Sequence, residues 1–97
     1  FYIMIEKPIA AVEKFHETYQ LLSNHSPTVA IPEAIKTLRY ELMKEENEEY
    51  KEAVDNNDMV EVADALGDML YILCGTIITH GMQHKISRFL RKFNVLI

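Results

Sequence analysis

Carboxylate side chains crowd one part of this chain. Eleven of the fifteen acidic residues lie between Glu41 and Asp68, and the same stretch holds only two basic residues, Lys44 and Lys51. Such a run is either a solvated acidic surface or a set of ligands for divalent cations. Because most acidic runs on helices are solvated, the choice depends on whether some of these side chains occupy positions that should be buried.

The helices that carry these acids follow from the apolar periodicity and from the few prolines and glycines. We predict four helices, over residues 9–22, 32–55, 58–80 and 83–92. Asp58 is the predicted N-cap of the third helix, with Glu61 at capping-box spacing, and Gly81 follows its end. The fold class is therefore all-α, a single domain over residues 1–97. We expect an antiparallel helical bundle with two long central helices joined by a tight turn at residues 55–58.

Carboxylates interrupt apolar stripes on the two central helices. At about 100° per residue, one stripe of the second helix contains Ile35, Leu38, Leu42, Glu46, Glu49 and Ala53. The third helix has a core face made of Met59, Ala63, Leu66, Leu70, Leu73 and Ile77. Its opposite face carries Glu61, Asp64, Asp68, Tyr71, Ile72 and Gly75. A helix that is apolar on one face and acidic, then apolar, on the other is packed on both sides, so we expect assembly with a partner subunit.

The tight turn makes the two central helices antiparallel neighbours, which brings their acids together. Glu46 and Glu49 should face Glu61 and Asp64 across the hairpin, with Asp68 one turn further along. Converging carboxylates repel one another unless they are protonated or neutralised by cations. Mg²⁺ is a hard cation that a few carboxylates, waters and substrate phosphates usually hold together. The pattern therefore favours a Mg²⁺ site over a purely solvated face.

Two short motifs resemble a known group of enzymes. "EENEE" contains E-E-x-x-E as Glu45, Glu46 and Glu49, and "EVAD" supplies E-x-x-D as Glu61 and Asp64. With "VEKFHETY" and "DMVEVADALGDMLYILCGTIITHG", they resemble the all-α nucleoside triphosphate pyrophosphohydrolase superfamily. That superfamily includes MazG-type enzymes and phosphoribosyl-ATP pyrophosphohydrolases. The resemblance covers roughly residues 9–85.

The resemblance implies a Mg²⁺-dependent hydrolase that cleaves a nucleoside triphosphate between its α and β phosphates, giving a monophosphate and pyrophosphate. Mn²⁺ is a possible substitute for Mg²⁺. Glu45 or Glu49 would orient the attacking water or accept its proton. The implied metal ligands are Glu46, Glu49, Glu61, Asp64 and Asp68. Among the third-helix acids we favour Asp64, which is the aspartate of the literal E-x-x-D match, and Asp68, because the family's aspartate often lies three residues before an aromatic residue, here Tyr71. The substrate-binding candidates are Tyr71, Lys85 and Arg88.

Nucleotide-pool house-cleaning is the expected role, carried out by a homodimer or a dimer of dimers. Two alternatives remain: hydrolysis of phosphoribosyl-ATP in histidine biosynthesis, and a non-catalytic helical module that only oligomerises. The net charge of −5 argues against a nucleic-acid partner. We expect no stretch with the length of a membrane-spanning helix, and the single cysteine, Cys74, forms no internal disulfide. We therefore expect a cytoplasmic protein without a membrane partner.

Overall fold

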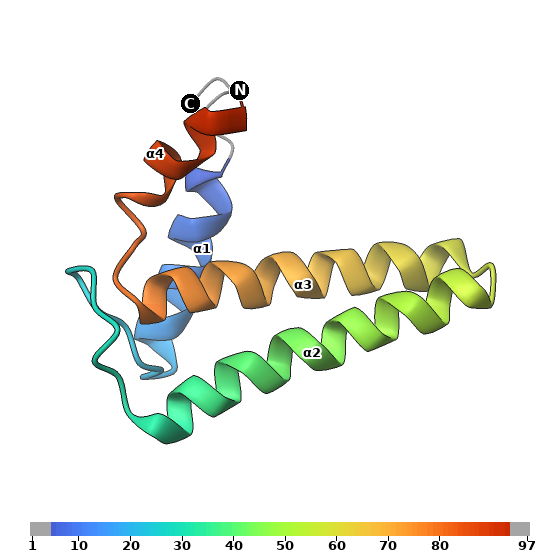
Figure 1. Ribbon diagram of the computed structural model, residues 1–97, viewed down its shortest axis with the longest axis horizontal. Coiled ribbons are helices and arrows are strands. Elements are labelled where there is room, and N and C mark those ends of the chain that lie inside the picture. Colours follow the sequence, from blue (N-terminus) through green and yellow to red (C-terminus); the bar gives the residue numbers. More distant parts are fainter. Residues whose placement is uncertain (1–4, 94–97) are drawn as a thin grey trace. The chain divides into compact units, whose positions relative to one another are not determined.

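A computed structural model of the protein describes residues 5–93, and all regular secondary structure in this range is helical (Figure 1). The elements are α1 (Glu6–Thr18), α2 (Glu33–Asp55), α3 (Met59–Thr79), α4 (Ile86–Leu90) and a 3-10 turn, η1 (Arg91–Phe93). The all-α prediction is confirmed. The described chain divides into two compact units. One is the helix hairpin Pro32–Leu73, and the other contains the described residues on either side of it.

The hairpin unit consists of α2 and the larger part of α3, which run antiparallel and are joined by a tight turn (Figure 1). Asn57 adopts a positive φ of 55° in this turn. Asp58 Oδ1 accepts a hydrogen bond from the Glu61 backbone N–H at 3.1 Å, which confirms the predicted N-cap. The Asp58 N–H donates to the Ala53 carbonyl instead of to the Glu61 side chain. The capping-box role of Glu61 is therefore wrong, and its carboxylate is left for other contacts.

The hairpin buries small side chains and leaves larger apolar ones exposed. Ala53 on α2 and Ala65 on α3 are almost fully buried, whereas Leu66 is 49% and Leu70 43% exposed. The predicted core face of α3 is thus wrong for residues 59–73 of this chain, and Leu38 on α2 is also exposed. The reason is that α3 buries the side that carries Ala65. Its leucine face has no covering neighbour among the described residues.

The other unit has a conventional apolar core. Ile9 and Val12 of α1 pack with Cys74, Ile77 and Ile78 of the last turns of α3. Cys74 is fully buried, and burial raises the pKa of its thiol, as expected for an unreactive core residue. This packing lets α1 fix the carboxyl-terminal end of α3.

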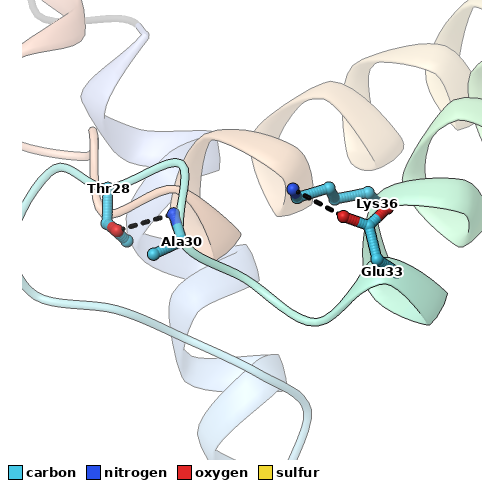
Figure 2. Close-up of polar contacts among 4 residues, drawn as sticks. All are labelled: Thr28, Ala30, Glu33 and Lys36. Atoms are coloured by element: carbon cyan, nitrogen blue, oxygen red, sulfur yellow. Dashed lines mark hydrogen bonds and ion pairs between the residues drawn. The ribbon is translucent and has the colours of Figure 1, made fainter.

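Hydrogen bonds from side chains to backbone carbonyls attach the loop that follows α1 to the end of α3. The Asn24 side-chain amide donates to the Thr79 carbonyl at 2.6 Å, and the Gln83 amide donates to the Asn24 carbonyl at 2.8 Å. His80 Nδ1 lies 2.9 Å from the Thr28 carbonyl oxygen. The Thr28 hydroxyl in turn accepts a hydrogen bond from the Ala30 N–H (Figure 2).

Helix ends differ most from prediction in the first and fourth helices. α1 begins at Glu6 rather than residue 9, because Pro8 is accommodated within its first turn, and it ends at Thr18. Beyond it, Gln20 takes a positive φ of 56°. The fourth helix is shorter than predicted and continues as the 3-10 turn η1. α2 matches its prediction closely, and a Glu33–Lys36 ion pair of 3.0 Å lies in its first turn (Figure 2).

By length and composition alone, α3 is able to span a membrane, since it has 21 residues and an 18-residue window with a mean hydropathy of 1.5. This corrects the expectation that no stretch has the required length. The finding is weak evidence, because buried helices of globular proteins meet the same criterion. Three carboxylates along α3 (Glu61, Asp64 and Asp68) oppose insertion into hydrocarbon.

Two glycines of the chain offer a matched test of this description. A Cβ at Gly81, where φ is +68°, would collide with the Ser26 carbonyl, whereas a Cβ at Gly67 would meet no atom within 4 Å. Gly81→Ala should lower the free energy of unfolding by about 1–3 kcal/mol or more. Gly67→Ala, in a helix interior, should raise it by up to about 1 kcal/mol. Urea denaturation of both variants measures the difference, and equal effects would contradict the described turn at Gly81.

Candidate metal centre

Three carboxylates of α2 form one cluster. Glu45, Glu46 and Glu49 each offer an oxygen atom, and these oxygens all lie within 4.8 Å of one another. The spacing explains the geometry, because residues three and four apart share a helix face and Glu45 adjoins Glu46. Glu45 and Glu49 are exposed, while Glu46 is half-buried. The cluster is therefore open to solvent on one side.

Glu46 lies at the centre of the acidic site. Its Oε2 atom is buried and has no hydrogen-bond partner among the described residues. Desolvation raises the pKa of Glu46, and the neighbouring negative charges of Glu49, Asp68, Glu45 and Asp64 raise it further. Every one of these influences disfavours the carboxylate form, and none of them supplies a counter-charge.

The third-helix acids relate to this cluster in two ways. Asp64 and Asp68 raise the pKa of Glu46 through their charges, as the predicted convergence across the hairpin requires. Glu61 lies nearer the turn, where it lines a cavity of about 160 Å³ together with Glu49 and Glu52. Glu49 thus belongs both to the α2 cluster and to this cavity. The assignment of individual carboxylates as metal ligands stays a prediction.

The donor set fits a hard divalent cation. All of the converging atoms are carboxylate oxygens, the ligands that Mg²⁺ and Mn²⁺ prefer. A cation beside Glu46 would give its buried Oε2 atom a partner and would oppose the raised pKa by stabilising the carboxylate form. The residues present therefore suit a metal ion that retains open positions for water or phosphate.

Tyr71 and a residue missed by sequence analysis, Arg39, lie further along the same hairpin. Arg39 is half-buried on α2, and Tyr71 of α3 acts electrostatically on it. The sequence does contain a signal for Arg39, because it precedes Glu46 by seven residues and therefore lies on the same face of the helix. Lys85 and Arg88 belong to the other compact unit, so their approach to the acids stays a prediction.

Comparisons with known proteins agree with these motifs. The family model described as phosphoribosyl-ATP pyrophosphohydrolase matches residues 12–94. An uncharacterised protein of Acanthamoeba polyphaga mimivirus is 38% identical over 81 residues, covering 77% of this chain and 32% of that relative. The chain therefore spans about a third of the length of this relative. No solved structure matches significantly.

The raised pKa of Glu46 predicts a pH-dependent effect of replacing it. A carboxyl group with a raised folded-state pKa binds more protons in the native state, so it destabilises the fold above that pKa and not below the unfolded value. Glu46→Gln should therefore melt higher than wild type at pH 7, by on the order of a few degrees. The difference should disappear as the pH falls below the usual pKa of glutamate.

Glu48→Gln is the matched control, because Glu48 is exposed and is not among the acids whose charges raise the pKa of Glu46. It should change the melting temperature little at either pH. Mg²⁺ or Mn²⁺ should raise the melting temperature of wild type more than that of Glu46→Gln. A Glu46→Gln variant that is less stable than wild type at pH 7 without metal would contradict the described electrostatics.

Proposed function

We propose that this chain, which belongs to the phosphoribosyl-ATP pyrophosphohydrolase family, is a Mg²⁺-dependent nucleoside triphosphate pyrophosphohydrolase. It would convert a ribo- or deoxyribonucleoside triphosphate and water into the monophosphate and pyrophosphate. The observation that carries the proposal is the glutamate cluster of α2, in which the buried Oε2 of Glu46 has no partner among the described residues and the charges of Asp64 and Asp68 of α3 raise the pKa of Glu46.

The proposed division of roles follows from burial. Glu46 and Asp68, which are half-buried, would hold metal together with Asp64 and Glu49. Bound Mg²⁺ supplies charge neutralisation for the triphosphate and lowers the pKa of a water molecule. Glu45 is an exposed member of the cluster, where its carboxylate is free to orient a water or accept its proton. Glu61 would add a further carboxylate to the metal site from the adjoining cavity, which Glu49 also lines.

Phosphoribosyl-ATP is the second candidate substrate, because the matching family carries its name. Both candidate substrates contain a triphosphate, and a carboxylate–metal site recognises that part alone. In this proposal Mn²⁺ can replace Mg²⁺, the role is removal of unwanted nucleotides in the cytoplasm, and nucleic acid and membranes are not partners. The non-catalytic helical module is the remaining alternative.

Hydrolysis products separate these possibilities. Purified protein with Mg²⁺ should release monophosphate and pyrophosphate from at least one member of a panel of nucleoside triphosphates and phosphoribosyl-ATP. Glu49→Gln should lower kcat by about 10²–10⁴-fold, because it removes a proposed metal ligand and base. Chromatography of the products measures both effects.

Glu48→Gln serves again as the control, since Glu48 is exposed and lies outside the cluster. It should retain wild-type turnover. Activity on phosphoribosyl-ATP alone would favour the second candidate. Release of diphosphate and phosphate, or turnover that survives Glu49→Gln combined with Asp68→Asn, would overturn the assigned site.

The exposed apolar face of the hairpin supports the proposal of a homodimer or a dimer of dimers. Leu66, Leu70 and Leu73 recur every three or four residues on α3, and each is more than 40% exposed. Near the turn, Val54 of α2 adjoins Met59 and Val62 of α3 around one open hollow. The apolar surface therefore continues from one helix to the other. A second hairpin of the same kind is its natural complement, because the two faces would form a four-helix core.

Charge placed on the leucine face should break this assembly. Leu66→Glu combined with Leu70→Glu is expected to convert a dimer into a monomer, which light scattering after size-exclusion chromatography measures. Val60→Glu is the control, because Val60 is 76% exposed on α3 but lies about 100° or more away from that face. A wild-type monomer at tens of micromolar protein would contradict the proposal.

A further inference from the structure

Arg39 holds a positive charge that the hairpin does not pair. Its Nη1 atom is buried and has no hydrogen-bond partner among the described residues. Burial lowers the pKa of Arg39, and the group that opposes this effect is Tyr71. A tyrosine is neutral at pH 7 and an arginine remains charged, so Tyr71 does not balance the cation. A buried donor atom without a hydrogen-bond partner costs free energy in a folded protein.

A negatively charged side chain on the same stripe of α2, Glu46, also has a buried atom without a partner. Oε2 of Glu46 is likewise buried without a partner, seven residues further along the helix. Seven residues correspond to a rise of about 10.5 Å and to two turns, so both side chains emerge from the same face. The ion pairs found among residues 5–93 do not join them. The hairpin therefore contains an unsatisfied cation and an unsatisfied anion that do not neutralise each other.

One kind of ligand would supply partners to both Arg39 and Glu46. A cation beside Glu46 needs further oxygen ligands, and a guanidinium needs an anion with several acceptor oxygens. A polyphosphate that carries a divalent metal presents the metal to the carboxylates and phosphoryl oxygens to the arginine. A water molecule would serve either orphaned atom alone, but it would leave both charges uncompensated. A simple carboxylate ligand would satisfy Arg39 and be repelled by the five nearby acids.

We propose that Arg39 binds a phosphate group of the metal-bound triphosphate, with Tyr71 beside it on α3. This assignment rests on the proposed function for the identity of the nucleotide, but not for the binding of the phosphate chain. Arginine suits the task because its planar donors match two phosphoryl oxygens and because it is weakly hydrated. Arg39 touches the substrate and holds it; the carboxylates remain responsible for the water and the metal.

Inorganic tripolyphosphate is the probe that tests this assignment without any catalysis. In the presence of Mg²⁺, calorimetric titration of the full chain should show Arg39→Met binding tripolyphosphate about 10- to 100-fold more weakly than wild type. Arg39→Lys should fall between the two, since lysine keeps the charge but loses the paired donors. Lys44→Met is the matched control. It removes the same charge from an exposed position of α2 and should bind like wild type.

Two further readings separate recognition from a structural role. Affinity for Mn²⁺ alone should be unchanged in Arg39→Met, and its melting temperature without ligand should equal or exceed that of wild type. The second result is expected because the substitution removes a buried donor atom that has no partner among the described residues. If Arg39→Met is too unstable to purify, the role is structural and the proposal is overturned unless Arg39→Lys, folded as wild type, binds tripolyphosphate more weakly.

Failure of this assignment and failure of the proposed activity give different results. A chain that hydrolyses nucleoside triphosphates, and whose Arg39→Met variant binds tripolyphosphate as wild type does, keeps its activity and loses this role for Arg39. A chain that hydrolyses none of the tested nucleotides, yet binds Mg²⁺–tripolyphosphate through Arg39, keeps the binding role and loses the proposed activity. Absence of tripolyphosphate binding by wild type would overturn the Arg39 proposal directly.

Discussion

Mutual repulsion among carboxylates is the constraint on which the helix hairpin depends. Glu46 is half-buried among the charges of Glu49, Asp68, Glu45 and Asp64, and one of its oxygens has no partner among the described residues. Water screens exposed charges, but desolvation here removes part of that screening. The small side chains of Ala53 and Ala65 nearby let the two helices approach without filling the space with leucines. Space and negative charge together make the acidic seam, meaning the side of the α2–α3 hairpin that carries Glu46 and its neighbouring acids, suitable for a hydrated cation.

The placement of acids inside the hairpin forces its larger apolar side chains outward. α3 cannot present both its acidic side and its leucine face to the single neighbouring helix α2. Leu66 and Leu70 are consequently about half exposed. A chain of about 100 residues has too little core to leave such a face bare without loss of stability. The proposed metal site and the proposed subunit interface are therefore two consequences of one arrangement, since the same helix supplies opposite faces to each.

The sequence predicts the helices of this fold better than it predicts which helix faces pack against one another. Periodicity located α2 and α3, and local hydrogen-bond chemistry identified Asp58 as a cap and Gly81 as a stop. Periodicity assigns residues to faces, but it does not say which face meets which neighbour, so the leucine face of α3 was wrongly placed in the core. Arg39 escapes prediction for a related reason. Apolar residues and acids define the predicted stripe of α2, although a cation at the same angle belongs to it equally.

The charges of the hairpin limit which ligands it is able to bind, and they require a cation to bind before or together with a polyphosphate. The carboxylates repel a free triphosphate, so a polyphosphate gains access only when a cation neutralises the acids or accompanies the substrate. Once the cation is present, the unpaired guanidinium of Arg39 becomes an attractive group at the far end of the same seam. Neither charge selects a base or a sugar, because both act on metal and phosphate. In this scheme the hairpin supplies affinity for the triphosphate, and discrimination among nucleotides must come from side chains outside the acidic seam.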